Sequence, residues 1–538
     1  MSFPRLIQDL IADTLGPSLA AFGPELAVCA TIVALLLGHM LSAGRHAVAF
    51  GVMLIGSVTA LYLAAPWHYL ADPAPTVTET FTGMLIFDGL AVYLRALVLL
   101  FAVLFALVTR TSGVPDRDSA TEFYVLVLGA TLGMCLMVSA NHMLIVFLGV
   151  EMASVPSYAL AGLLRRRRQS SEAALKFAVF GGGTAGVMLY GISLLVGVLG
   201  SAHLPTMAHQ LAHLLGDPSA ADRHMVLALG GLMVMVGLAF KLSAVPFHFW
   251  APDVFEGATA EVAAFLSVAS KVAALGLLVR LALGFGYAGV EQIATLAPAR
   301  DYLVGLIALL AAVTCTFGNL AAYGQTNMKR LLAYSTIAHA GYMMMPAAAA
   351  VALIHGDPQT LASHQESARL AVASLAFYTG VYLFMNLGAF AVVAYLRNVL
   401  GSEEMADYAG LVRKSPGVAV CFSIILFSLV GLPPLAGFSA KFSIFAALVR
   451  PVSGAMDPRL LTLLAIGVLN TVLSLFYYLR VVRVMILQPE PQDRPAPEIR
   501  MASTAGAVCF ALTAPLVVLF VWSDGLLGWA TAAVRTLF

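Results

Sequence analysis

The stretch Ala239-Phe-Lys-Leu-Ser-Ala-Val-Pro-Phe-His-Phe-Trp250 places a lysine and a helix-breaking proline inside an apolar run. A second stretch, Gly431-Leu-Pro-Pro-Leu-Ala-Gly-Phe-Ser-Ala-Lys441, repeats this combination nearer the C-terminus. A charged side chain in hydrocarbon costs roughly 2.5–3.5 kcal/mol on insertion scales, so membrane lysines generally have a use. Interrupted helices in corresponding halves of a chain point to an ion path near the membrane midplane. The two stretches therefore predict an ion-translocating membrane subunit.

The composition around these stretches is that of a helical membrane protein. The chain has 538 residues, of which 60% are hydrophobic and 11% charged, and its mean hydropathy is +0.91. Such a composition predicts an all-α polytopic membrane protein, and we expect no nucleic-acid partner. The five cysteines are scattered singly without a CxxC motif or a Cys/His cluster, so we expect no metal or iron–sulfur site. The N-terminus shows no cleavable signal.

Apolar runs long enough to span a membrane number about fourteen. The fourth and fifth are separated only by Ser139-Ala-Asn-His142. The expected spans are 20–42, 46–65, 84–109, 121–139, 141–163, 174–200, 224–249, 260–283, 301–322, 330–350, 368–397, 417–449, 460–486 and 502–522.

The prolines indicate an internal repeat. They interrupt the seventh and the twelfth span, which are five spans apart. Because five is odd, a repeat of spans 4–8 onto spans 9–13 would be inverted in the membrane, as in many transporters. We therefore predict two inverted five-helix repeats, each with a discontinuous helix. The expected domains are helices 1–3 in 1–120, the first repeat in 121–283, the second in 301–486, and a loop with the last helix in 487–538.

The distribution of basic residues predicts the orientation. Loops after odd-numbered spans carry sixteen lysines and arginines, including the run Arg165–Arg168, and loops after even-numbered spans carry six. Positive loops face the cytoplasm, so both termini are expected on the other side. The Arg165–Arg168 run is interpreted as a topology anchor, with binding of anionic lipid headgroups as the alternative.

Two charges lie near the centres of their spans. Glu151 is about ten residues into its span, hence roughly 15 Å deep at 1.5 Å per residue, and Lys271 is equally central in a hydrocarbon core about 30 Å thick. Both are too deep to reach the headgroups freely. We interpret them as proton-transfer groups, with a structural ion pair between helices as the alternative.

Lys241 and Lys441 lie beside irregular backbone. Pro246, and the pair Pro433 and Pro434, each leave carbonyl groups of the preceding turn without donors. Such backbone survives at membrane depth only where it is buried in protein or lines water, and a proton path would supply that water. The alternative for both lysines is that each caps the broken end of its helix.

The remaining membrane charges are harder to interpret. Lys176 lies only a few residues into its span, so its ammonium is expected to reach the cytoplasmic interface. Asp88 and Arg95 are two turns apart and are expected to form a local structural pair. His248 and His339 are either packing residues or members of a proton relay near the lysines. Segment 203–222 is either a short interfacial helix or a polar loop.

Three motifs resemble a known family. They are Phe147-Leu-Gly-Val-Glu-Met-Ala-Ser-Val-Pro-Ser-Tyr158, Phe240-Lys-Leu-Ser-Ala-Val-Pro-Phe-His-Phe-Trp-Ala-Pro-Asp-Val-Phe-Glu-Gly257 and Asn319-Leu-Ala-Ala-Tyr-Gly-Gln-Thr-Asn-Met-Lys-Arg-Leu-Leu-Ala-Tyr-Ser335. Together they resemble the antiporter-like membrane subunits of respiratory complex I, the bacterial NADH–quinone oxidoreductase. The likeness runs from roughly 80 to 485.

The resemblance implies specific roles. In that family Glu151 would pair with Lys241, Lys271 would connect inward, and Lys441 would pass the proton outward, although some sister subunits carry glutamate there. Lys176 would modulate the Glu151–Lys241 pair. The resemblance also implies that this subunit binds no cofactor, because the FMN, the iron–sulfur clusters and the quinone belong to partner subunits. The implied partners are neighbouring antiporter-like subunits and membrane lipid in the bacterial cytoplasmic (inner) membrane.

Other functions remain open for this sequence. A subunit of a multi-component sodium/proton antiporter shares the same ancestral fold, and so does a membrane subunit of an energy-converting hydrogenase. A structural subunit whose charges only hold helices together is a further alternative.

Overall fold

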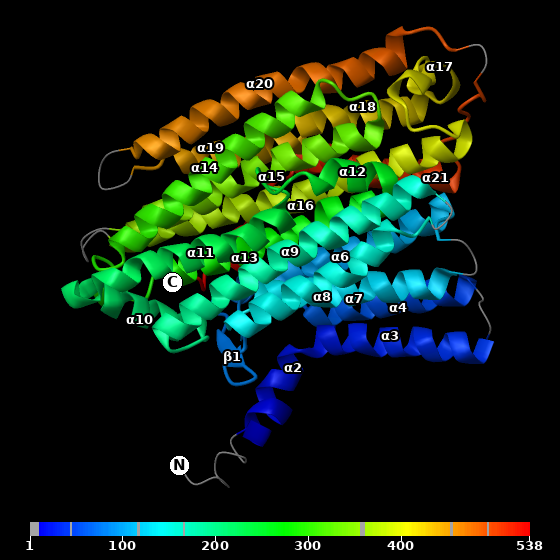
Figure 1. The fold of residues 1–538 in the computed structure, drawn as a ribbon. Coiled ribbons are helices and arrows are strands. Elements are labelled where there is room, and N and C mark those ends of the chain that lie inside the picture. The colour runs from blue at the N-terminus through cyan, green and yellow to red at the C-terminus, as the bar shows by residue number, and fades with distance from the viewer. Residues whose placement is uncertain are drawn as a thin grey trace.

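The computed structural model describes residues 10–42, 46–115, 119–164, 167–355, 361–451, 456–491 and 494–538. Within these ranges long helices run side by side in one bundle, and both described chain ends lie at the same end of it (Figure 1). The helices of the N-terminal half are α2 (Leu19–Ala21), α3 (Gly23–Ser42), α4 (His46–Ala64), α5 (Pro66–Tyr69), α6 (Gly89–Ser112), α7 (Ala120–Ser139), α8 (Met143–Ala161), α9 (Arg168–Leu199), α10 (Leu204–Gly216), α11 (Ala221–Leu242), α12 (Trp250–Gly257) and α13 (Ala260–Gly286). Those of the C-terminal half are α14 (Ala297–Ala322), α15 (Met328–Leu353), α16 (Leu361–Leu400), α17 (Leu411–Lys414), α18 (Pro416–Val430), α19 (Ala436–Leu448), α20 (Pro458–Leu487), α21 (Thr504–Val521) and α22 (Asp524–Ala533).

The expected set of spans is confirmed. Among the described residues 13 helices are long and apolar enough to cross a membrane. The remaining expected span, 417–449, consists of the two shorter apolar helices α18 and α19. The narrow separation between the fourth and fifth spans is real, because α7 ends at Ser139 and α8 begins at Met143. The chain is thus a multi-pass helical membrane protein.

Two details differ from the sequence-based expectation. Residues 84–87 do not begin the third span: strand β2 (Leu85–Phe87) pairs antiparallel with β1 (Thr78–Thr80), and α6 begins only at Gly89. The seventh span does not end at 249, because its second half, α12, continues to Gly257. The undecided segment 203–222 contains helix α10. Arg165 and Arg166 of the basic run lie outside the described residues.

Backbone hydrogen bonds relate the two halves of the bundle. Before α8, Met143 N donates to Ala202 O at 2.8 Å and Leu204 N donates to Asn141 O at 2.9 Å. Before α15, Met328 N donates to Glu403 O at 2.9 Å and Met405 N donates to Thr326 O at 2.8 Å. The second pair of bonds has the pattern of the first, shifted by one repeat.

The two pairs of bonds lie at opposite ends of the bundle. The first lies beside α10 and the β-hairpin, which we call the hairpin end, and the second lies beside α17, which we call the α17 end (Figure 1). Equivalent connections at opposite ends are what an inverted repeat requires. The inverted relation predicted from the prolines is therefore visible in the backbone.

Each discontinuous helix stops in the same way. After α11, Ser243 adopts a left-handed φ of +57°; Ser243 N donates to Phe240 O and Ala244 N donates to Ala239 O. After α18, Gly431 adopts a φ of +87°, with the same two bonds to Ser428 O and Phe427 O. Both are Schellman motifs, which satisfy the last carbonyls of a helix. The left-handed residue lies three positions before Pro246 in the first break and three before Pro434 in the second.

The expected local pair of Asp88 with Arg95 is wrong. Arg95 Nη1 instead donates to Glu25 Oε1 of α3 at 3.0 Å, and Asp88 accepts from Arg280 of α13 at 2.7 and 3.0 Å. Two turns separate Asp88 from Arg95 by about 10 Å along the helix axis, beyond ion-pair reach. The two buried pairs tie α6 to α3 and to α13, and Asp88 also caps α6 by accepting from Ala91 N at 2.8 Å.

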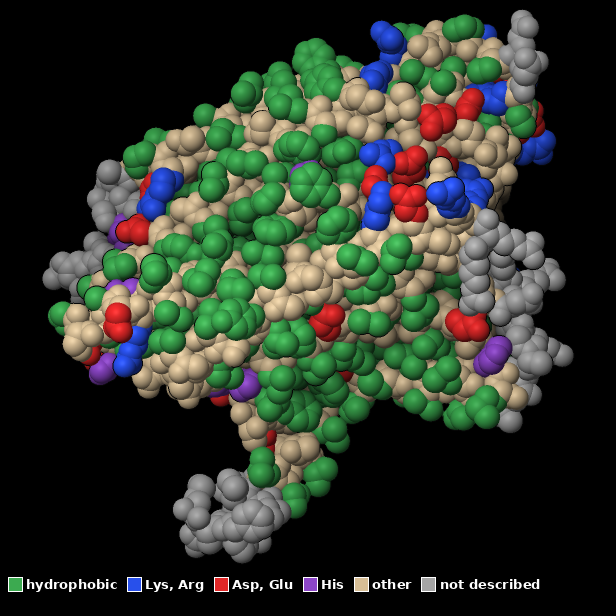
Figure 2. Space-filling model, in the orientation of Figure 1, with side chains coloured by type: hydrophobic (Ala, Val, Ile, Leu, Met, Phe, Trp, Pro, Cys, Tyr) green, Lys and Arg blue, Asp and Glu red, His purple; other side chains and the backbone are tan. Residues whose placement is uncertain are grey.

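Charged side chains are concentrated outside the middle of the bundle. Figure 2 shows a broad apolar belt with a cluster of blue and red side chains near the α17 end. That end carries several of the arginines and lysines of the odd-numbered loops, among them Lys329, Arg330, Arg413 and Lys414. The apolar belt is the surface expected to face lipid.

We predict that Asp88→Ala lowers the free energy of unfolding by about 3–5 kcal/mol, because it leaves the buried Arg280 guanidinium without its carboxylate. The matched control is Asp301→Ala. Asp301 is 70% exposed in its pair with Arg459, and surface pairs contribute about 0–1 kcal/mol. Denaturant titration of the purified chain in mixed micelles measures both variants. Equal stability of the two variants would contradict the buried-pair assignment.

Candidate functional site

The predicted site residues lie on five different helices. Glu151 is on α8, Lys241 on α11, Lys271 on α13 and Lys441 on α19, while Lys176 is near the start of α9. Three of the lysines are buried, with exposed fractions of 5% for Lys241, 0% for Lys271 and 3% for Lys441. The side chain of Lys176 is 38% exposed. The structure therefore separates three interior lysines from one at the surface.

Glu151 and Lys241 are near each other without touching. Glu151 is half-buried and its Oε1 lies 3.4 Å from Ser154 Oγ. The charge of Lys241 acts on Glu151 and that of Glu151 on Lys241, but no ion pair joins these two described residues. The pair implied by the family resemblance is thus not in direct contact here, and its two charges act on each other over a distance. Lys241 also forms no hydrogen bond to the end of α11, so it does not cap the broken helix.

Lys271 is bound to the first break. Its Nζ donates to Ser243 Oγ at 2.8 Å and lies 5.0 Å from the centre of the Trp250 ring, a cation–π contact. Ser243 is the left-handed residue that ends α11, two positions after Lys241. The hydroxyl at the break therefore fixes the ammonium of Lys271 beside the helix end that carries Lys241. We did not foresee Ser243 as a site residue, because only its position in the break distinguishes it from other serines.

Lys441 is bound across the second break. Its Nζ donates to Val430 O, the last carbonyl of α18, at 2.9 Å, and lies 4.4 Å from the centre of the Tyr342 ring. The capping alternative thus describes the geometry of Lys441 well. Capping does not exclude proton transfer, because the partly negative end of a helix stabilises an ammonium and leaves its protons within reach of other acceptors.

The two histidines have different surroundings. His339 Nδ1 lies 2.6 Å from Tyr378 Oη and its Nε2 lies 3.5 Å from Tyr478 Oη, which is also bonded to Ser335. His339 is therefore part of a buried hydroxyl network between α15, α16 and α20. His248 packs against the rings of Phe249 and Phe317, and no described group bonds its Nδ1. The relay interpretation is compatible with the contacts of His339, whereas those of His248 are the contacts of a packing residue.

The network around His339 could have been predicted from the spacing of polar residues along the sequence. Ser335, His339 and Tyr342 follow one another at intervals of four and three residues, so they share one face of α15. Tyr342 connects this face to Lys441, and its hydroxyl lies 3.3 Å from Thr471 Oγ1. Polar residues at helical spacing within an apolar span therefore lie between His339 and Lys441.

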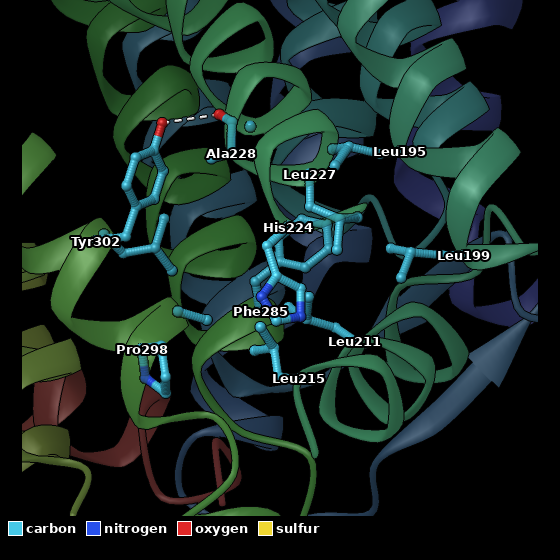
Figure 3. A pocket seen from close by; sticks show the side chains of 13 residues that line it. Leu195, Leu199, Leu211, Leu215, His224, Leu227, Ala228, Phe285, Pro298 and Tyr302 are labelled. Atoms are coloured by element: carbon cyan, nitrogen blue, oxygen red, sulfur yellow. Dashed lines mark hydrogen bonds between the residues drawn. The ribbon is translucent and has the colours of Figure 1, made fainter. Parts of the chain in front are cut away.

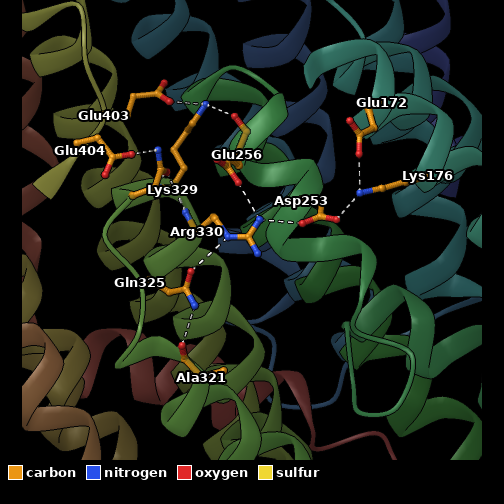
Figure 4. Close-up of polar contacts among 11 residues, drawn as sticks. Glu172, Lys176, Asp253, Glu256, Ala321, Gln325, Lys329, Arg330, Glu403 and Glu404 are labelled. Carbon is orange, nitrogen blue, oxygen red and sulfur yellow. Dashed lines mark hydrogen bonds and ion pairs between the residues drawn. The ribbon is translucent and has the colours of Figure 1, made fainter. Parts of the chain in front are cut away.

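Lys176 belongs to a charged cluster at the α17 end. Its Nζ lies 2.8 Å from Glu172 Oε1 and 2.7 Å from Asp253 Oδ2 (Figure 4). Lys176 thus lies at the surface of the bundle, and its expected position at the cytoplasmic interface stays a prediction. No contact joins Lys176 to Glu151, so any effect of Lys176 on Glu151 acts over a distance.

An apolar cavity of about 240 Å³ lies apart from all of these residues. It is formed at the hairpin end by α9, α10, α11, α13 and α14, and His224 and Tyr302 lie at its wall (Figure 3). Tyr302 Oη donates to Ala228 O at 2.9 Å. None of the predicted site residues lines this cavity, so it is separate from Lys241, Lys271 and Lys441.

Comparison with known proteins gives consistent matches. The family described as "NADH:quinone oxidoreductase/Mrp antiporter, TM" matches residues 140–474. A protein of Anaeromyxobacter sp. (strain Fw109-5) named NADH-quinone oxidoreductase subunit N is 35% identical over 522 residues, which cover 96% of each chain.

Solved structures of similar chains exist. A chain of respiratory complex I from Thermus thermophilus with bound aureothin is 30% identical and superposes with a TM-score of 0.70, covering 94% of this chain and 98% of that one. A chain of the Mrp complex from Dietzia sp. DQ12-45-1b has a TM-score of 0.78 at 19% identity, covering 97% and 98%, and this likeness concerns the fold alone.

We predict that Lys271→Met leaves the thermal unfolding temperature of the chain unchanged or raises it. A buried ammonium without a carboxylate costs desolvation energy that a methionine does not, while loss of the bond to Ser243 costs about 1–3 kcal/mol. Arg280→Met is the contrast, since it strands the Asp88 carboxylate and should lower stability by about 3–5 kcal/mol. A large fall in unfolding temperature for Lys271→Met would assign this lysine to the fold.

Proposed function

Because this chain belongs to the family of NADH:quinone oxidoreductase and Mrp antiporter membrane subunits, we propose that it is the proton-translocating subunit N of the membrane arm of an NADH–quinone oxidoreductase, respiratory complex I. The observation that carries the proposal is the set of three buried lysines arranged around two broken helices, in a chain that matches subunit N over nearly its full length. A subunit of this kind does no redox chemistry itself, and is driven by the enzyme complex to which it belongs.

The proposed path runs along the interior of the bundle. Glu151 and Lys241 form its first proton-holding site, with charges that act on each other. Ser243 links the neighbourhood of Lys241 to Lys271. The hydroxyl network of His339 and Tyr342 leads to Lys441 at the second break. Glu151, Lys241, Lys271 and Lys441 hold and release the proton in this proposal, while Pro246, Pro433 and Pro434 create the breaks beside which the lysines lie.

The free energy of moving a proton across the membrane is comparable with the free energy of burying a charge. Moving one charge against about 180 mV costs roughly 4 kcal/mol, at about 2.3 kcal/mol per 100 mV. The effective penalty for burying an ion in protein is several kcal/mol and is offset when an opposite charge comes close. A change in the spacing of Glu151 and Lys241 can therefore alter the free energy of a proton by about the amount that pumping requires.

The assembly and its orientation are part of the proposal. The positive loops put the α17 end in the cytoplasm, and both described chain ends lie at the hairpin end, hence on the periplasmic side of a bacterial inner membrane. Residues 121–283 and 301–486 would act as the two halves of the path. FMN, iron–sulfur clusters and quinone would be bound by partner subunits, and neighbouring antiporter-like subunits and lipid would contact the apolar belt.

We expect Lys241→Ala to abolish most NADH-driven acidification of inverted membrane vesicles, with the complex still assembled on native gels. Removing the ammonium removes a site where the proton resides and the charge that acts on Glu151. The matched control is Lys414→Ala, an exposed lysine on α17, which should leave acidification at the native level. Unchanged NADH-driven acidification together with lost sodium/proton exchange would assign the chain to the antiporter branch of its family.

Glu151→Gln tests the other member of the Glu151–Lys241 pair. The amide keeps the shape of the side chain but carries no charge, so quinone-dependent acidification should fall by about tenfold or more while the amount of assembled complex stays the same. Glu122→Gln, at an exposed position of α7, is the control. Lost assembly in place of lost acidification would mean that Glu151 only holds helices together.

A further inference from the structure

A single carboxylate fastens the second half of the first broken helix to both repeats. Asp253 of α12 accepts from Lys176 Nζ of α9 at 2.7 Å through Oδ2 and from Arg330 NH1 of α15 at 2.8 Å through Oδ1. Helix α9 belongs to the first repeat and α15 to the second. Figure 4 shows Asp253 between the two cations.

Each cation also has a carboxylate of its own. Lys176 lies 2.8 Å from Glu172, and Arg330 lies 2.7 Å from Glu256. Lys329 contacts the same helix differently, by donating to the carbonyls of Glu256 and Ala258, while its charge is matched by Glu403 at 2.8 Å. Among these contacts only Asp253 is shared between α9 and α15. Its loss would uncouple the two helices without leaving either cation unpaired.

Helix α12 connects Asp253 to the surroundings of the buried lysines Lys241 and Lys271. It has only eight residues, and its first residue, Trp250, lies one turn before Asp253. The Trp250 ring stacks on Phe177 of α9 with centroids 4.2 Å apart and lies under Lys271 Nζ at 5.0 Å. Trp250 Nε1 also donates to Phe240 O, in the turn that carries Lys241. A shift of α12 therefore moves the ring that contacts Lys271.

The contact is open to water. A cavity of about 250 Å³ lies between α9, α12 and α15, and its charged lining residues are Glu172, Lys176, Asp253, Glu256 and Arg330. A cavity of this size with several polar partners can hold water. The charge state and hydration of the cluster can thus change from outside the bundle, whereas Lys271 is fully buried.

The repeat supports the importance of this position. Counted from the left-handed residue of each break, Asp253 is ten residues after Ser243 and Lys441 is ten residues after Gly431. The turns that follow also match, since Phe247 N donates to Ala244 O and Leu435 N donates to Leu432 O. The position that holds a buried lysine in the second repeat therefore holds Asp253 in the first.

We propose that Asp253 is a positioning residue for proton transfer: by bridging Lys176 and Arg330 it holds α12 between the two repeats and keeps Trp250 under Lys271. The inference rests on the proposed function only for its link to pumping. The bridge and its effect on Trp250 can be measured without any proton movement.

The first experiment uses Trp250 as a probe in the full chain reconstituted in nanodiscs. Trp67, Trp522 and Trp529 are each partly exposed and are replaced by Phe, so that Trp250 alone reports. We expect Asp253→Asn to shift its emission and raise its access to a water-soluble quencher about twofold or more, and Asp253→Glu to restore part of the native signal. Glu172→Gln, which contacts Lys176 alone, should leave the signal native. An unchanged signal in Asp253→Asn would overturn the proposal.

The second experiment measures NADH-driven acidification in vesicles with the assembled complex. Asp253→Asn should lower it by about tenfold or more, because displacement of a reacting group by about 1 Å can cost about 100-fold. Arg330→Gln should lower it as well, and the double variant should be no worse than Arg330→Gln alone, since the bridge through Asp253 is already broken in that variant. Additive losses would overturn the shared bridge. Absence of NADH-driven acidification in the native vesicles would instead refute the proposed function, and the Trp250 result would still decide the role of Asp253.

Discussion

Every interrupted helix in this bundle must satisfy its own backbone, because hydrocarbon offers no water to do so. Both breaks meet this requirement with a Schellman motif built on a left-handed residue, Ser243 or Gly431. Each break also offers one acceptor to a buried ammonium: the hydroxyl of Ser243 in the first and the carbonyl of Val430 in the second. Each accepts from a buried lysine, Lys271 in the first break and Lys441 in the second. The lysines are thus placed by the same features that allow the helices to be broken.

Two kinds of buried charge can be distinguished among the described residues. Arg95 with Glu25, and Arg280 with Asp88, are buried pairs in direct contact, and they connect α3, α6 and α13. Lys241, Lys271 and Lys441 are equally buried but lack a contacting carboxylate among the described residues. A fold that needed only ion pairs for cohesion would have no reason to retain the second class, since an unpaired buried ion is a net cost. Such cost is typical of functional positions.

The sequence predicted well whatever depends on local pattern. The spans follow from apolar length, the breaks from Pro246, Pro433 and Pro434, and the burial of Lys271 from its depth in a span. The sequence did not predict contacts between residues that are far apart along the chain. Arg95 was assigned to Asp88 because they are close in sequence, yet Glu25 is 70 residues away. Ser243 and Asp253 acquire their contacts only through the meeting of α13, α9 and α15 with the first break, which no local pattern describes. The roles of the site residues remain predictions.

The inverted repeat also bears on direction. Two identical halves related by inversion would give a path that reads the same from either side of the membrane, and such a path has no preferred direction. Here the halves differ in their charged residues: Lys441 occupies in the second repeat the place that Asp253 occupies in the first. Helix α11 runs toward the α17 end and α18 runs away from it (Figure 1). Lys241, before its break, and Lys441, after its own, therefore both lie on the hairpin side of the break, while Asp253 lies on the α17 side. The lysines and the carboxylate are displaced in opposite directions, so the two ends of the proposed path differ in charge. A directional pump needs such an asymmetry, and an ideal repeat would lack it.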